Sequence, residues 1–338
     1  MQGEILADRY TCTEPLGGGA AGEVWEAWDT AQGRAVVIKV WRAPLADDAA
    51  FGRFRGDVGA LAGLAALFAT SNQRSARIAV PLDSGRTSDG RPFVVTDLVA
   101  GRSLAQVLRD EGPLPWPTVA DLGRQAATAL ATAHRGSVLH GAIKPTNVLI
   151  SEGASAGDSA GDSAGDSVSI ANISGEGAAH GPAPDVVTLV DFALPSLADS
   201  AGPSDGPAPG AAAYTAPEKA VGHPAGPAAD LYALGCVLYE ALTGRPPFTA
   251  ATDEQVVYQH VHDEPVRLAQ LRPDAHPQLR DIVTALLAKN PENRPRGADT
   301  VARDLAALQP DGPPTGHKAA PPASEDATQL LPPVAAPA

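Results

Sequence analysis

The sequence predicts an α+β protein whose first hundred residues are rich in β-strands and whose remainder is mainly α-helical. Residues 8–40 alternate β-forming segments with turns, a pattern typical of a small antiparallel sheet. Several later segments carry apolar residues at every third or fourth position, which is the period of a helix buried along one face. The two patterns meet near residue 100.

The β-rich part contains three expected strands within residues 8–40, separated by a glycine-rich turn and a second turn. A helix is expected over residues 46–68, because apolar residues from Phe51 to Leu67 keep a helical spacing. This helix is expected to pack on the sheet. Two more strands are expected near residues 78–82 and 93–98.

The helical part is expected to bury several amphipathic or apolar helices. The segment 230–243 is strongly apolar and is followed by Gly244 and two prolines, which end a helix. The expected helices cover residues 103–108, 120–134, 230–243 and 276–289.

Two segments have compositions that do not support a packed core. Residues 151–184 contain the run Ala-Gly-Asp-Ser three times and no lysine or arginine, so we interpret them as a disordered insertion. Residues 309–338 are rich in proline and alanine and are interpreted as a disordered tail.

Composition excludes several classes of function. The 338 residues include 39 acidic and 25 basic side chains, a formal charge of −14, which argues against nucleic acid as a partner. The two cysteines, Cys12 and Cys236, are too far apart in sequence to suggest a zinc site and too few for a disulfide framework. No apolar run has the length of a membrane span. We therefore expect a soluble, cytoplasmic protein.

The glycine-rich turn has the pattern Gly17-x-Gly19-x-x-Gly22-x-Val24. Such a turn lets backbone N–H groups approach phosphate oxygens, although by itself it is equally typical of a flexible hairpin. Lys39 follows in the third expected strand, where its ammonium could reach the phosphates of a nucleotide, or could simply face solvent.

An ordered series of further motifs decides between these interpretations. It consists of His140-Gly141-Ala142-Ile143-Lys144-Pro145-Thr146-Asn147, Asp191-Phe192-Ala193, Ala216-Pro217-Glu218, Asp230-Leu231-Tyr232-Ala233-Leu234-Gly235 and Asn293-Arg294-Pro295. With the glycine turn and Lys39, this series resembles the eukaryotic-like (Hanks-type) bacterial protein Ser/Thr kinase family. The resemblance implies a two-lobed protein kinase-like fold over residues 8–308, with a β-rich N-lobe (8–98) and a helical C-lobe (102–308). It also implies ATP and Mg²⁺ between the lobes.

The resemblance assigns a role to each matching residue. Asn147 and Asp191 match the two magnesium ligands, and Lys144 matches the lysine that contacts the γ-phosphate. The remaining nucleotide-binding positions are Gly17, Gly19, Gly22 and Val24 over the phosphates, Lys39 on the phosphates, Thr96 as gatekeeper, and the backbone of Asp97 and Val99 at the adenine. Glu218 and Arg294 match an ion pair that braces the C-lobe, and Asp230 a residue that supports the catalytic loop.

The departures from the family pattern concern the phosphate acceptor. Ala142 stands where the family has the aspartate that accepts the proton of the substrate hydroxyl. Ala211 replaces the threonine that contacts this aspartate, and Gly141 replaces the arginine that pairs with an activation-loop phosphate. A positioned base contributes roughly 10²- to 10⁴-fold to the rate, so its loss predicts at most trace phosphotransfer.

Three other departures concern the nucleotide. Asp57 stands where the family has the glutamate that pairs with Lys39, and its side chain is one methylene shorter. Val37 occupies the position of the alanine that lines the adenine, which predicts weaker binding. Ala193 replaces the glycine that follows Asp191-Phe192 and restricts the backbone there.

These observations favour a catalytically impaired kinase-fold protein, a pseudokinase, that binds ATP with Mg²⁺ and regulates or scaffolds Ser/Thr phosphorylation signalling. One alternative is an active protein serine/threonine kinase that uses a displaced base or none, and a second is an interaction module that binds no nucleotide. Expected partners are active Ser/Thr kinases. A phosphothreonine-reading domain could bind at Thr328, which has acidic residues before it and Leu331 after it.

Overall fold

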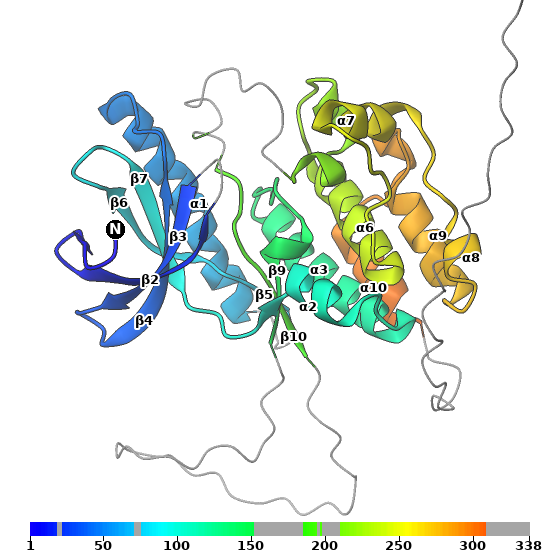
Figure 1. Cartoon of the computed structure of the whole chain (residues 1–338), viewed down its shortest axis with the longest axis horizontal. Coiled ribbons are helices and arrows are strands. Elements are labelled where there is room, and N and C mark those ends of the chain that lie inside the picture. The colour runs from blue at the N-terminus through cyan, green and yellow to red at the C-terminus, as the bar shows by residue number, and fades with distance from the viewer. Residues whose placement is uncertain (19–21, 71–75, 152–184, 195–196, 198–209, 309–338) are drawn as a thin grey trace, which may run out of the picture. The chain divides into compact units, whose positions relative to one another are not determined.

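The computed structural model describes residues 1–18, 22–70, 76–151, 185–194, 197 and 210–308. These residues form the α+β fold that the sequence predicts, with a β-rich part followed by a helical part (Figure 1). Gly19, Thr328, the segment 152–184 and the tail 309–338 lie outside the described residues. Within the described residues, no helix is long and apolar enough to cross a membrane.

Six antiparallel strands form the N-terminal sheet, in the order β1-β2-β3-β4-β7-β6. Strand β4 shows why the two faces of this sheet differ. Its residues Val36, Ile38 and Val40 are at most 1% exposed and join one apolar cluster, while Lys39 points to the opposite face. The strands are β1 (Ile5–Leu6), β2 (Tyr10–Gly18), β3 (Gly22–Asp29), β4 (Arg34–Trp41), β6 (Pro81–Arg86) and β7 (Pro92–Asp97).

One long helix, α1 (Asp48–Thr70), packs against the N-terminal sheet, close to the predicted range 46–68. Its apolar stripe is buried from Phe54 to Leu64 and belongs to the same cluster as Val94 of β7. The amphipathic spacing seen in the sequence is therefore the face that holds the helix on the sheet.

A second sheet of short strands begins the helical part, in the order β5-β10-β9-β8. Ser151 at the end of β9 pairs with Val186 at the start of β10, so the chain leaves and re-enters this sheet at neighbouring positions on either side of 152–184. The insertion therefore leaves the sheet intact. The strands are β5 (Ala76–Ile78), β8 (Arg102–Ser103), β9 (Val148–Ser151) and β10 (Val186–Leu189).

The helices of this part pack around α6, which is buried along most of its length. Ranges agree with the prediction within a few residues for α2, α3, α6 and α9, whereas α7, α8 and α10 were not predicted. The α-helices are α2 (Leu104–Glu111), α3 (Trp116–Arg135), α5 (Pro217–Ala220), α6 (Pro227–Thr243), α7 (Asp253–His262), α8 (Leu268–Leu271), α9 (Pro277–Leu286) and α10 (Ala298–Ala306). Three short 3₁₀ helices are η1 (Pro145–Asn147), η2 (Ala212–Tyr214) and η3 (Pro291–Asn293).

A buried ion pair joins two distant segments of the helical part. Arg294 donates from Nη1 and Nη2 to the two carboxylate oxygens of Glu218, at 2.7 and 2.8 Å, and its side chain is fully buried. The same guanidinium donates to backbone carbonyls of Ala228, Ala288 and Lys289. This network fixes α5 against the start of α6 and the loop before η3.

Candidate functional site

The glycine-rich turn joins β2 to β3 at one edge of the site. Gly17 pairs with Val24, and Val24 in turn pairs with Lys39 of β4. A Cβ atom added at Gly22 would lie 2.3 Å from the carbonyl oxygen of Val40, so only glycine fits there. Gly17 has no atom within 4 Å of such a Cβ position. Close packing therefore explains Gly22 but not Gly17.

Lys39 forms an ion pair with Asp191, which follows β10. The two side chains are 24% and 31% exposed, so both remain accessible from the cavity described below. The Lys39 ammonium also lies 4.9 Å from the centre of the Trp41 ring. The sequence offered Asp57 of α1 as the partner of Lys39. In the structure the Lys39 ammonium pairs with the carboxylate of Asp191.

Asp191 has a left-handed backbone conformation, with φ of 62°, which is uncommon for a residue with a side chain. The following residues hold this turn in place. The ring of Phe192 stacks on the ring of His140 at a centroid distance of 4.2 Å, and the Ala193 N–H donates to the His140 carbonyl at 2.8 Å. The carboxylate of Asp191 is thereby fixed opposite Lys39.

Asp230 of α6 holds the loop between α3 and β9 in place through hydrogen bonds to its backbone. Its carboxylate accepts hydrogen bonds from the backbone N–H groups of His140 and Gly141, both at 2.8 Å, and lies 2.9 Å from Nε2 of His134. Burial raises the pKa of Asp230, but these hydrogen bonds outweigh it and hold the pKa below its ordinary value. Burial also lowers the pKa of His140. This loop therefore rests on a buried carboxylate that stays ionised.

Asn147 ends the loop and is 5% exposed. Its Nδ2 donates to the carbonyl oxygen of Ala142 at 2.8 Å, and its Oδ1 accepts from the hydroxyl of Thr146 at 3.3 Å. The side chain is thus oriented by the residue that occupies the base position. Asn147 and Asp191 supply oxygen atoms, the donors that Mg²⁺ prefers, and Mg²⁺ takes only one or two protein carboxylates when substrate phosphates complete its shell. The donor types therefore fit magnesium.

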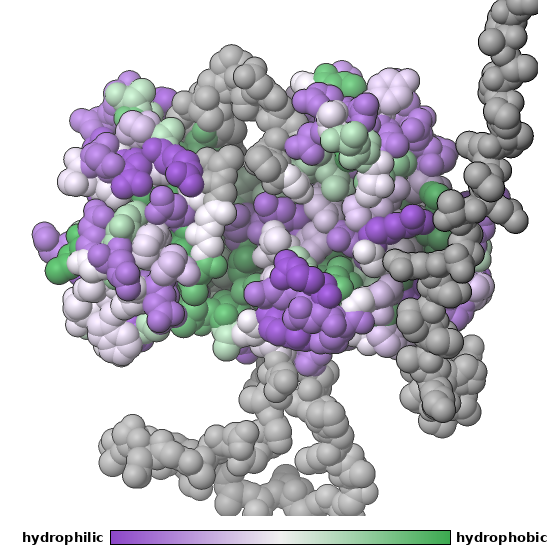
Figure 2. Space-filling model, in the orientation of Figure 1, coloured by the Kyte–Doolittle hydropathy of each residue, from purple (hydrophilic) through white to green (hydrophobic). Residues whose placement is uncertain are grey.

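A cavity of about 770 Å³ brings together several of the residues that the sequence singled out. Its lining includes Lys39, Ala142, Lys144 and Asp191, so four of the residues singled out from the sequence share one space. Among the described residues, the acidic side chains of the lining are Asp191, which pairs with Lys39, and Asp230, which accepts hydrogen bonds from the loop. At position 142 the cavity is lined by the methyl group of Ala142 and not by a carboxylate. Figure 2 shows apolar residues in the recess between the β-rich and helical parts.

The expected adenine-binding positions lie on β7 and just after it. Thr96 of β7 pairs with Val37 of β4, two residues before Lys39 on the same strand. Asp97 directs its side chain outward, where it is 52% exposed and accepts a hydrogen bond from Arg34 at 2.7 Å. Asp97 and Val99 are not part of the 770 Å³ cavity lining.

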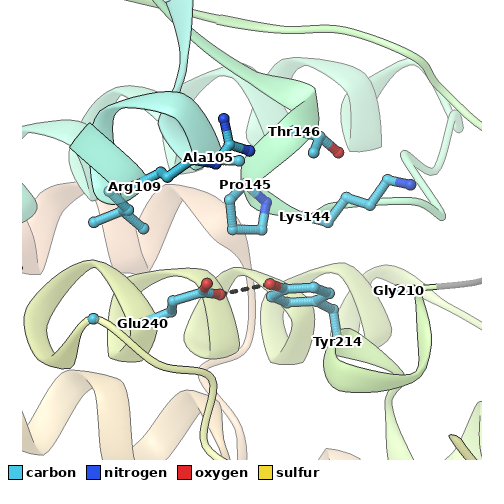
Figure 3. Close-up of a pocket in the computed structure, with 10 residues that line it drawn as sticks. Ala105, Arg109, Lys144, Pro145, Thr146, Gly210, Tyr214 and Glu240 are labelled. Atoms are coloured by element: carbon cyan, nitrogen blue, oxygen red, sulfur yellow. Dashed lines mark hydrogen bonds between the residues drawn. The ribbon is translucent and has the colours of Figure 1, made fainter. Parts of the chain in front are cut away.

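A second cavity of about 380 Å³ adjoins the first and shares Lys144 and Tyr214 with it. Figure 3 shows its centre, where the Tyr214 hydroxyl donates to the Glu240 carboxylate at 2.5 Å. Arg109 and Thr146 lie on the opposite side of this cavity from Glu240. Burial raises the pKa of Glu240 above its ordinary value, and the hydrogen bond from the Tyr214 hydroxyl offsets only part of this rise.

Sequence reasoning missed two elements of this site. Lys219, the residue after Ala216-Pro217-Glu218, donates from Nζ to the carbonyl oxygen of Gly141 at 3.0 Å and lines the larger cavity. Its position next to a recognised motif was a usable signal. The pairing of Tyr214 with Glu240 spans 26 residues, and no spacing rule indicated it.

Comparison with known proteins identifies relatives over most of the chain. Residues 10–305 match the model of the protein kinase domain family. The chain is 32% identical over 317 residues to a protein named serine/threonine-protein kinase PknB of Mycobacterium leprae, covering 93% of this chain and 45% of that protein. It is 33% identical over 347 residues to the protein of the same name from Mycolicibacterium smegmatis, covering 97% and 49%. The chain thus spans about half the length of these curated relatives.

A solved structure of similar fold is that of Rad53, residues 1–466, in complex with AMP-PNP. The TM-score is 0.62 at 20% sequence identity, and the match covers 88% of this chain and 64% of that one. At this identity the likeness concerns the fold: a β-rich N-lobe and a helical C-lobe.

Proposed function

Because this chain belongs to the protein kinase domain family, we propose that it is a catalytically impaired member, a pseudokinase, that binds ATP with Mg²⁺. It acts in this proposal as a regulatory or scaffolding partner in Ser/Thr phosphorylation signalling. The observation that carries the proposal is the cavity lining around Ala142. Among the described residues its acidic side chains are Asp191 and Asp230, and both are engaged by other partners, so none of the described carboxylates of the lining is available to accept a proton.

The residues that hold phosphate and metal are retained. Lys39, Lys144 and Asp191 line one cavity, and Asn147 is oriented beside it through the Ala142 carbonyl. Mg²⁺, when bound, supplies positive charge that offsets the phosphate oxygens. In this role Asn147 and Asp191 bind the metal, and Lys39 and Lys144 orient the phosphates. Retention of these groups without a base favours binding over turnover.

The size of the expected defect follows from the chemistry. Phosphoryl transfer depends mostly on positioning and electrostatic stabilisation, and the base adds roughly 10²- to 10⁴-fold, or about 3 to 5 kcal/mol of barrier. Ala211 also lines the cavity and has no hydroxyl with which to orient an acceptor. The two losses concern the same half of the site, the half that receives the phosphate.

Nucleotide titration tests the binding half of this proposal. Mg²⁺-ATP is expected to raise the melting temperature of the purified chain, because a ligand of the folded state stabilises it by mass action. Lys39→Met should abolish this rise, whereas Arg53→Met, which removes a charge from the exposed face of α1, should leave it unchanged. No rise in the wild-type protein at millimolar ATP would contradict the proposal and favour an interaction module without nucleotide.

An active protein serine/threonine kinase is the second candidate. It is favoured by the shared cavity of Lys39, Lys144 and Asp191, and by the names of the mycobacterial relatives. Such an enzyme would depend on positioning alone or on a base outside the family position. Mg²⁺-dependent phosphate incorporation that disappears in both Lys39→Ala and Asp191→Ala would establish this candidate.

A further inference from the structure

We propose that the acceptor half of the larger cavity binds a phosphorylated serine or threonine side chain, held between the ammonium groups of Lys144 and Lys219. This inference rests on the proposed function, because a cleft that does not transfer phosphate is free to retain a phosphorylated partner. It gives the cavity a second ligand beside the nucleotide and assigns a role to Lys219.

The distribution of lysine is the first observation behind this inference. The chain has only five lysines among its 25 basic residues, the other 20 being arginines. Three of these five, Lys39, Lys144 and Lys219, line the same 770 Å³ cavity. The chain as a whole carries a formal charge of −14, so this local excess of positive charge opposes the overall balance.

The charges of the lining do not cancel. Lys39 is neutralised by Asp191, and Arg42 lies 3.9 Å from Glu23. Asp230 also lines the cavity, but it is 2% exposed and its carboxylate is engaged by the backbone N–H groups of His140 and Gly141 and by His134. In the part of the chain that the structure describes, Lys144 and Lys219 are the lining cations that form no ion pair with a carboxylate.

Within the described part of the chain, the Lys144 side chain forms no ion pair and no hydrogen bond. In Figure 3 its side chain extends away from Glu240, the carboxylate of the adjoining cavity, which itself accepts from Tyr214. Its ammonium therefore keeps three donors for a ligand.

Lys219 is held at the residue that precedes Ala142. Its Nζ donates to the neutral carbonyl of Gly141, so the contact fixes the position of the charge without cancelling it. Gly141 itself has φ of +69°, a conformation that turns this carbonyl toward its partner at little cost because glycine has no Cβ. Lys219 thus brings a positive charge to Gly141, the position at which the family has an arginine.

The alanine at position 142 completes the site. An aspartate there would add a negative charge to the cavity that the two lysines line and would repel a phosphate ester, whereas a methyl group does not. Ala193, Ala211 and Ala216 also line the cavity and leave room for a bulky side chain. The substitution that removes the base therefore also makes the site able to retain an anion.

A phosphate monoester matches two ammonium groups better than a carboxylate does. It carries a charge of about −1.5 to −2 at pH 7 and three acceptor oxygens. The terminal phosphate of ATP has the same chemistry, so the experiment must separate the two sources.

The test is a fluorescence-polarisation titration of the full chain with a labelled Ala/Gly peptide that carries one central phosphoserine. The same peptide with unmodified serine is the control ligand. The phosphopeptide is expected to bind and the serine peptide not to bind. Lys219→Met should weaken phosphopeptide binding roughly tenfold or more, as expected for loss of a charge-assisted hydrogen bond, and leave ATP binding unchanged. Arg53→Met should leave both unchanged.

The base position provides a second pair of variants. Ala142→Asp should abolish phosphopeptide binding through repulsion, and Ala142→Asn, of similar size without the charge, should preserve it. Equal affinity for the two peptides, or equal effects of Asp and Asn at this position, would overturn the inference.

Competition separates the phosphate sources and the two proposals. Saturating Mg²⁺-ADP should leave phosphopeptide binding intact. If ATP displaces the peptide and Lys219→Met weakens ATP instead, the site belongs to the nucleotide and the inference is wrong. Absence of phosphopeptide binding with retained ATP binding would overturn this inference alone, while phosphotransfer by the wild-type chain would overturn the proposed function.

Discussion

The ammonium of Lys39 on β4 pairs with the carboxylate of Asp191, a residue 152 positions later in the chain. This ion pair connects the β-rich part to the segment after β10. It engages Oδ1 of Asp191, an oxygen that a bound metal ion would also need. In the proposed function this pair would link nucleotide binding to metal binding, because phosphates would compete for the lysine and Mg²⁺ for the carboxylate.

Asp191→Asn is expected to remove the magnesium dependence of nucleotide binding. In the wild-type chain, Mg²⁺ should strengthen ATP binding relative to the same titration in EDTA. The asparagine variant should show equal affinities under both conditions, because the amide lacks the charge that holds the metal. Calorimetric titrations with and without Mg²⁺ measure this difference. A full magnesium effect in the variant would mean that Asp191 is not a metal ligand.

Gly22→Ala is expected to destabilise the chain, whereas Gly17→Ala is not. The new methyl group at Gly22 would collide with the Val40 carbonyl, while the same change at Gly17 meets no neighbour. Overpacking of this kind costs about 1 to 3 kcal/mol. Urea unfolding of the two variants provides the measurement, and equal stabilities would show that the turn relaxes freely.

Disruption of the Glu218–Arg294 pair should be among the most destabilising single changes. Removal of one partner leaves the other charge buried without compensation, at a cost of about 3 to 5 kcal/mol. Arg294→Met is therefore expected to lower the melting temperature strongly, and Glu218→Gln to do so less. A variant within about 0.5 kcal/mol of the wild type would contradict a structural role for the pair.

Two largely buried carboxylates, Glu218 and Asp230, make the stability of the fold sensitive to acid. Burial raises the pKa of Glu218, yet the hydrogen bonds from Arg294 outweigh it and hold the pKa below its ordinary value; Asp230 behaves likewise. A depressed folded-state pKa contributes stability above the unfolded value of about 4, and this contribution is lost as the pH falls through the folded value. Burial lowers the pKa values of His140 and His260, the latter to about 4, so the unfolded chain takes up protons that the folded chain does not, and the unfolding free energy should fall as the pH drops below about 6.5. Below about pH 5 the two carboxylates add to this fall, and Glu218→Gln should lessen only that additional part.

Restoration of the acceptor half should raise phosphotransfer. Ala142→Asp returns the carboxylate, and Ala211→Thr returns the hydroxyl expected to orient it. The double variant is expected to incorporate phosphate at least about tenfold faster than the wild type, since a positioned base adds roughly 10²- to 10⁴-fold when its geometry is complete. Radiolabel incorporation from Mg²⁺-ATP measures the gain. A double variant as inactive as the wild type would place the defect elsewhere.

Local patterns predicted much of this fold. The alternation in β4 and the apolar stripe of α1 are strong periodic signals, because each follows from burial of one face. Strands β5, β8, β9 and β10 are two to four residues long and gain their form from pairing with each other, which spacing along the chain does not reveal. Helix α7 was missed because few of its residues are buried.

Within the site, the sequence singled out individual residues but did not predict how they pair. The motif series pointed to Lys39, Lys144, Asn147 and Asp191, and the structure places three of them in one cavity. The pairing of Lys39 with Asp191 and the contact of Lys219 with Gly141 depend on how the two parts of the fold approach each other. No short-range pattern carries that information.

The most direct test of catalytic impairment is phosphotransfer by the purified chain with Mg²⁺-ATP, to itself and to a generic basic protein substrate. Lys39→Ala serves as the control for contaminating kinases, and ATP binding is measured on the same preparation. A catalytically impaired protein is expected to bind ATP without phosphate incorporation above that control. Incorporation that is clear in the wild type and absent in Lys39→Ala would contradict it and identify an active kinase.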